Sequence, residues 1–191
     1  MINKVFFYAV LLIGSILIVS SCSSTPVKPE LKSATLLPAP QVMNDFKLKH
    51  FNDGAFNIGS LKNQWSLFFF GYTRCPDVCP TELYMLSEVM KLIEQNPSSV
   101  QQSPQVVFVS VDPHMDTLKA LAEYAKFYHP SFKGVTGEQK EVDALAKTMG
   151  AFYERAYLVG KSLQVIKSKT DVPEGLEDSY LINHSASIVL T

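Results

Sequence analysis

The stretch from Trp65 to Pro80 has the sequence W-S-L-F-F-F-G-Y-T-R-C-P-D-V-C-P. Its first part, Trp65 to Phe70, is an apolar run of the kind that forms a strand covered on both faces. Its second part holds two of the chain's three cysteines, Cys75 and Cys79, in a C-x-x-x-C spacing among prolines. Two thiols on a turn between a strand and a helix can close a disulfide, exchange disulfides with a partner or bind a soft metal ion.

Strand and helix patterns alternate on both sides of this turn. Apolar residues at helical spacing predict helices over residues 81–95, 118–128 and 138–149. Apolar runs and alternation predict a hairpin within 46–58 and strands at 66–70, 106–111, 132–135, 151–159 and 185–190. Buried strands that alternate with helices are typical of right-handed βαβ units, so the fold class is α/β.

The α/β class makes a prediction about where chemistry collects. The carboxyl ends of parallel strands lie at one edge of the sheet, where such proteins place their sites. We therefore expect the cysteine turn and the turn from Asp112 to Asp116 to share that edge.

The N-terminal residues have the pattern of an export signal. Lys4 is followed by an apolar run over residues 5–19, and Ser20-Ser21-Cys22 then resembles a lipobox. We predict a lipoprotein signal peptide over 1–22 with lipidation of Cys22; an uncleaved membrane anchor is the alternative. A tether rich in proline and serine is predicted over 23–45, and the folded domain over 46–191.

This organisation predicts a cell-membrane lipoprotein whose domain faces the periplasm or another extracytoplasmic, oxidising space. The chain has 191 residues, 47% of them hydrophobic, which suffices for one domain with a substantial core. Its formal net charge of −1 gives no support for a nucleic-acid partner.

The cysteine pair has a chemical environment that favours reaction over simple cross-linking. A disulfide here would close a very short loop, which stabilises a fold little. We expect the following helix to begin at Pro80, with both cysteines on the preceding loop and Asp77 as the helix cap. The helix end and Arg74 are expected to lower the thiol pKa values.

A histidine would complete a soft-metal site built on two thiolates. The chain has four histidines, and His114 and His184 are the better candidates from their positions. His114 lies on the neighbouring turn, and His184 precedes the predicted last strand. For any single histidine a structural role is the default interpretation.

The motifs described so far resemble the Sco/SenC family of copper-binding, thioredoxin-like proteins. The resemblance rests on F-G-Y-T-R-C-P-D-V-C-P at 70–80, on V-S-V-D-P at 109–113 with Asp116 and Thr117, and on His184-Ser185. It implies a thioredoxin-like fold with an N-terminal β-hairpin, and copper held by Cys75, Cys79 and His184.

The resemblance also implies a function. A member of this family would deliver copper to the binuclear copper centre of cytochrome c oxidase, or reduce the thiols of that centre. The pair Cys75 and Cys79 would then be the reacting thiols if the protein is a thiol-disulfide reductase, which is the alternative. We expect a binding and transfer protein rather than a turnover enzyme, with a copper-bearing oxidase subunit or another copper protein as partner.

Three features depart from the family pattern. Met115 stands where arginine is usual, and Asn183 stands where aspartate often precedes the histidine. The sequence stops at Thr191, so the family's usual C-terminal strand and helix are expected to be missing. Because His114 and Met115 are copper-compatible residue types beside the cysteines, one of them could assist or replace His184.

Overall fold

The computed structural model describes residues 31–32, 34–51, 54–165, 172 and 174–191. The chain divides into two units, Met1–Pro40 and Gln41–Thr191. In the first unit, the described residues 31–32 and 34–40 form no helix or strand. The predicted signal segment, with Cys22, lies outside the described residues. None of the helices that the structure describes is long and apolar enough to cross a membrane.

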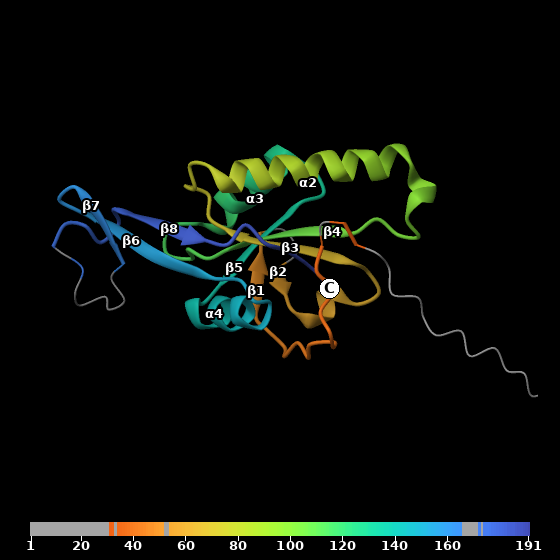
Figure 1. Cartoon of the computed structure of the whole chain (residues 1–191), viewed down its shortest axis with the longest axis horizontal. Coiled ribbons are helices and arrows are strands. Elements are labelled where there is room, and N and C mark those ends of the chain that lie inside the picture. The colour runs from red at the N-terminus through yellow and green to blue at the C-terminus, as the bar shows by residue number, and fades with distance from the viewer. Residues whose placement is uncertain (1–30, 33, 52–53, 166–171, 173) are drawn as a thin grey trace, which may run out of the picture. The chain divides into compact units, whose positions relative to one another are not determined.

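The second unit is built on a six-stranded sheet with the strand order β2-β1-β5-β4-β3-β9 (Figure 1). Its strands are β1 (Leu48–His50), β2 (Gly54–Phe56), β3 (Ser66–Gly71), β4 (Gln105–Ser110), β5 (Lys133–Gly137) and β9 (Ile188–Leu190). The helices are α2 (Val78–Gln95), α3 (Leu118–Tyr128) and α4 (Gln139–Thr148), with short 3-10 turns at Ile58–Leu61 and Pro97–Ser99. The predicted hairpin is confirmed as β1 and β2, although residues 52–53 of its turn are outside the described range.

Three parallel strands form the centre of this sheet, as the α/β prediction requires. β4 pairs with β3 on one side and with β5 on the other, both in parallel. Gly71 at the end of β3 lies opposite Ser110 at the end of β4, and the N–H of Val111 donates to the carbonyl of Gly71 at 2.8 Å. The cysteine turn and the Asp112–Asp116 turn therefore leave the same edge of the sheet, as predicted.

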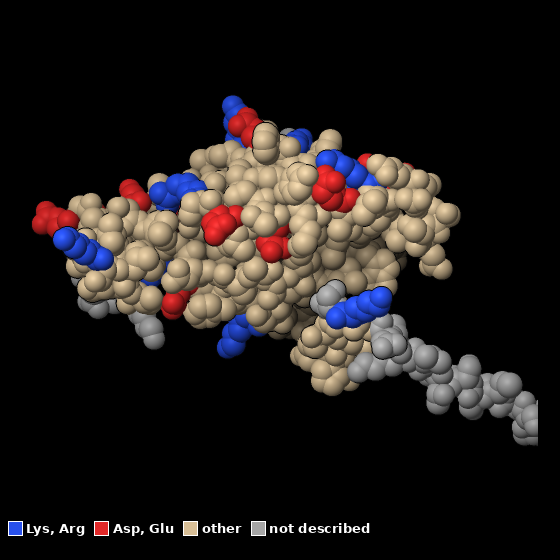
Figure 2. Space-filling view, turned by 45° about the horizontal axis from the view of Figure 1, so that its top comes forward, with Lys and Arg blue, Asp and Glu red and all other residues tan. Residues whose placement is uncertain are grey.

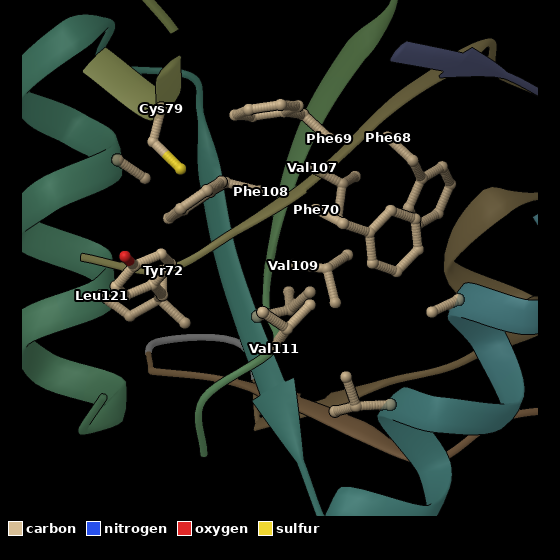
Figure 3. Packing of buried hydrophobic residues seen from close by; sticks show 14 of the residues in the cluster. Phe68, Phe69, Phe70, Tyr72, Cys79, Val107, Phe108, Val109, Val111 and Leu121 are labelled. Atoms are coloured by element: carbon tan, nitrogen blue, oxygen red, sulfur yellow. The ribbon is translucent and has the colours of Figure 1, made fainter. Parts of the chain in front are cut away.

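Helices cover both faces of the sheet, with α2 and α3 on one side and α4 on the other (Figure 1). The alternation of side chains along β3 divides its phenylalanines between the two faces. The ring of Phe69 stacks on Phe108, which contacts Tyr124 of α3. Figure 3 shows Cys79 and Phe108 on this side and Phe70 on the side toward α4. The side of the sheet that carries Cys79 is thus continuous with the core.

A second, three-stranded sheet has the order β7-β6-β8, from β6 (Tyr153–Val159), β7 (Ser162–Val165) and β8 (Tyr180–His184). The sequence patterns did not predict β8. Its buried residues Tyr180 and Ile182 alternate with exposed ones, but one exposed residue is Leu181, which hides the period of two. The predicted last strand, 185–190, is shorter in the structure: β9 begins at Ile188, and His184 ends β8 four residues earlier.

Candidate metal centre

Helix α2 begins earlier than the sequence predicted, and this places Cys79 within it. The helix starts at Val78, so Cys79 lies in its first turn, whereas Cys75 lies on the preceding loop as predicted. Pro80 is the third helical residue, and the first N–H groups of a helix have no partner within the helix. The missing N–H of Pro80 therefore costs no helical bond, and proline does not mark the helix start here.

The N-terminus of α2 is capped by sulfur rather than by carboxylate. Asp77 occupies the N-cap position, but its side chain makes no capping hydrogen bond, so the capping role predicted for it is wrong. Instead, the N–H of Cys79 donates to Sγ of Cys75 at 3.4 Å. This contact holds the Cys75 sulfur at the N-terminus of the helix.

Cys75, Cys79 and His184 come together although 105 residues separate Cys79 from His184. The Nε2 atom of His184 lies 3.5 Å from Sγ of Cys75 and 3.2 Å from Sγ of Cys79. The three donor atoms all lie within 4.8 Å of one another. Within the described part of the chain, this is the one group of three or more His, Cys, Asp or Glu side chains with such spacing.

The His184 ring is held in the tautomer that a metal ligand needs. Its Nδ1 lies 3.2 Å from the carbonyl oxygen of Ser185, which can only accept a hydrogen bond. Burial lowers the pKa of His184, which favours the neutral ring. A neutral ring with its proton on Nδ1 leaves the Nε2 lone pair free, and Nε2 is the atom that faces both sulfurs.

The expectation that Arg74 and the helix end make both thiols acidic is wrong for Cys79. Its side chain is fully buried, and burial raises the pKa of the thiol well above its ordinary value. A hydrogen bond from the Tyr72 backbone opposes this in part, while the neighbouring Cys75 adds to it. The guanidinium of Arg74 instead donates to Asp112 at 3.2 Å and to the backbone oxygen of Asp178 at 3.3 Å.

The neighbouring turn fixes the loop that carries Cys75. Asp116 is buried, and its carboxylate accepts from the N–H of Thr73 at 3.0 Å and from its hydroxyl at 2.5 Å. The hydroxyl of Ser110 donates to the same carboxylate at 2.6 Å. With the Arg74 contact to Asp112, two successive loop residues are attached to the turn just before Cys75. The sequence indicated that the turns share an edge but gave no sign of these bonds.

Aromatic rings close the inner side of the site. Tyr72 and Phe69 both meet the His184 ring edge-on, with centroids 5.9 and 6.0 Å away. The Tyr72 hydroxyl oxygen also accepts from the N–H of Ile182 at 3.2 Å. Tyr72 belongs to the family motif at 70–80, but the sequence analysis assigned it no role at the site.

The other histidine candidate lies elsewhere. Nε2 of His114 faces the carboxylate of Asp178 at 2.8 Å, and both side chains are exposed. Met115 is half-buried and packs against the core. The structure therefore brings His184, and not His114, to the thiols.

Together these features define a class: an α/β protein of thioredoxin-like fold, with two buried cysteines and a half-buried histidine grouped at the carboxyl edge of its sheet. The SCO1/SenC family model matches residues 34–191. The chain therefore belongs to the SCO1/SenC family.

Individual relatives agree with this assignment. A SCO2-like protein of Rickettsia prowazekii is 31% identical over 187 residues, which cover 97% of this chain and 82% of that protein. A SCO2-like protein of Rickettsia conorii is 35% identical over 117 residues, 61% of this chain. The crystal structure of Arabidopsis thaliana ScoI with copper bound is 30% identical, with a TM-score of 0.61 over 78% of this chain and 80% of that one. The chain spans about 55% of the length of several curated relatives.

Proposed function

We propose that this chain is a copper chaperone that holds a copper ion between Cys75, Cys79 and His184. The observation that carries the proposal is the convergence of two sulfurs and one imidazole nitrogen within 4.8 Å. Thiolates select soft ions such as Cu(I), and a neutral imidazole suits copper as a third ligand. The copper-bound relative supports the choice of copper over zinc.

The exposure of the three side chains supports transfer of the copper ion to a partner. Cys79 is fully buried, but Cys75 is 8% exposed and His184 is half-buried, so an incoming ligand would reach the copper from their side. We take the receiving protein to be the copper-bearing subunit of cytochrome c oxidase, as membership of this family suggests. The predicted lipid anchor at Cys22 would hold the protein at the same membrane, with its domain in the extracytoplasmic space.

Replacing the histidine tests this function. We expect His184→Ala to weaken Cu(I) binding by the reduced full chain, measured by competition with a chromogenic Cu(I) chelator. It should leave the reactivity of the two thiols with a disulfide reagent close to that of the wild type. His114→Ala is the matched control and should bind copper normally. Wild-type copper affinity in His184→Ala would contradict the proposal.

A thiol-disulfide reductase is the second candidate, because Cys75 and Cys79 are both free cysteines and their sulfur atoms lie within 4.8 Å of each other. In that function Cys75, the more exposed sulfur, would attack a partner's disulfide and Cys79 would displace the reduced partner. The partner gains two electrons and this chain keeps a Cys75–Cys79 disulfide. Oxidase assembly that survives His184→Ala but fails in both Cys75→Ser and Cys79→Ser would favour this function.

A further inference from the structure

We propose that Asp112 is a positioning residue for the copper site: its buried carboxylate holds β8 so that His184 reaches the two thiols. The inference rests on the proposed function, because it assigns a role in the ligand set of that same site. Nothing in the sequence motif identifies Asp112 as more than a turn residue.

The Asp112 side chain is fully buried and joins three segments of the chain. Oδ2 accepts from Arg74 on the cysteine loop at 3.2 Å. Oδ1 accepts from Tyr180 on β8 at 2.6 Å and lies 3.4 Å from Nη2 of Arg155 on β6. The Asp112 carboxylate thus links the cysteine loop, which follows β3 of the six-stranded sheet, to β8 of the three-stranded sheet, which carries His184.

Tyr180 is the residue of β8 that contacts Asp112, Arg74 and Arg155. The guanidinium carbon of Arg74 lies 5.3 Å from the centre of its ring, and that of Arg155 lies 5.0 Å away. Both guanidinium groups contact the Tyr180 ring and the Asp112 carboxylate. The Tyr180 hydroxyl donates to that same carboxylate. Movement of β8 away from the cysteine loop would break the contacts that Arg74 and Asp112 make with Tyr180.

Tyr180 and His184 lie on the same face of β8, since side chains two and four residues apart along a strand point the same way. Between them, the backbone N–H of Ile182 donates to the Tyr72 hydroxyl. Strand β8 is therefore attached to Asp112 through Tyr180 and to Tyr72 through Ile182. Two residues further on, it carries the imidazole of His184. Together with the pairing of β8 to β6, these two attachments set where Nε2 lies relative to the sulfurs.

The charges explain why a carboxylate is needed at this position. A buried Asp112 opposite two guanidinium groups neutralises part of their charge, and loss of a partner from such a network is costly. A hydrophobic residue would leave both cations and the tyrosine hydroxyl without their common acceptor. The network is therefore suited to fix one geometry rather than to permit several.

Tyr180→Phe is the sharpest test, because it keeps the ring between the guanidiniums and removes only the hydroxyl that donates to Asp112. We expect Cu(I) affinity of the reduced full chain to fall about tenfold, as is usual when a group that orients a metal ligand is lost. The Cu(II) form should show weaker nitrogen coupling in its electron paramagnetic resonance spectrum. Tyr157→Phe is the matched control. The Tyr157 ring packs on Tyr180 with centroids 5.5 Å apart, but in the described part of the chain the tyrosine hydroxyl that donates to Asp112 is that of Tyr180.

A double-mutant cycle with His184→Ala separates positioning from general damage to the fold. If Tyr180 acts through His184, Tyr180→Phe should cost nothing further in copper affinity once the imidazole is gone. Equal losses in both backgrounds, or wild-type affinity and nitrogen coupling in Tyr180→Phe, would overturn the inference. If Tyr180→Phe fails to fold, Arg155→Gln gives the same cycle from another partner of the carboxylate. Wild-type affinity in His184→Ala alone would instead refute the proposed function, and the inference with it.

Discussion

Gly71 lies so close to Cys79 that a Cβ atom at residue 71 would sit 2.3 Å from the Cys79 sulfur and 2.9 Å from the ring of Phe108. A methyl group at this position cannot be accommodated unless the sulfur or the ring moves. The absence of a side chain at Gly71, the last residue of β3, thus leaves room for the thiol of Cys79 at the start of α2. The end of the sheet therefore packs directly against a residue of the copper site.

Gly71→Ala should therefore damage the site more than the fold. Overpacking of this kind costs about 1–3 kcal/mol of unfolding free energy, and here the displaced atom is a proposed ligand. We expect a matching loss of stability in chemical denaturation together with weaker Cu(I) binding.

Gly134→Ala is the matched control for that variant. A Cβ at residue 134 would meet the backbone oxygen of Leu121 at 2.5 Å, on α3 and not on a ligand. It should destabilise the protein by a similar amount while the folded protein keeps normal copper affinity. Normal copper affinity in both variants would show that Cys79 adapts without cost.

Thr73→Val should loosen the loop that carries Cys75. The variant removes the hydroxyl bond to the buried Asp116 carboxylate, and a bond to a charged group contributes about 1.5–3 kcal/mol. We expect that loss in unfolding free energy and a faster reaction of Cys75 with a thiol reagent. Thr148→Val, which removes an exposed hydroxyl bond on α4, should change neither by a comparable amount. Unaltered thiol reactivity in Thr73→Val would mean that the backbone bond alone holds the loop.

The sequence predicted the parts of this site that depend on local pattern. The strand before Cys75, the three helices and the common edge of the parallel strands all followed from apolar spacing and chain order. The family motif then pointed to His184, which no periodicity could have paired with residues more than 100 positions away.

The parts that were missed depend on contacts between distant segments. Tyr180 and Arg155 have no local pattern that reveals a shared partner, and Asp112 looks like an ordinary turn residue. Pro80 misplaced the helix start because a proline is tolerated throughout the first turn. The lowered pKa expected for Cys79 was wrong because burial, which the sequence does not give, raises the pKa of this thiol.

Removal of His114 and Met115 together should leave copper affinity unchanged. Nε2 of His114 is engaged by Asp178, and an exposed pair of this kind contributes at most about 1 kcal/mol to stability. We expect the double variant His114→Ala with Met115→Ala to match the wild type in chelator competition and in transfer to an acceptor copper protein. A loss of transfer with intact affinity would revive the idea that one of them receives the ion on its way out.

The metal-free protein should lose stability as the pH rises above the ordinary thiol pKa of about 8.5. Burial raises the pKa of Cys79 in the folded state, so the unfolded chain gives up this proton at a lower pH than the folded chain does. The unfolded state is thereby favoured, and this one thiol should lower the unfolding free energy by up to about 1.4 kcal/mol per pH unit between about pH 8.5 and pH 10. Denaturation of the reduced, copper-free chain across this range measures the slope. Cys79→Ala removes this thiol and should make the fall in stability shallower. Part of the fall should remain at the upper end of this range, because burial also raises the pKa values of Tyr72, Tyr124 and Tyr180 in the folded state, whereas tyrosines of the unfolded chain ionise at about pH 10. An equal slope in the variant would show that Cys79 does not contribute.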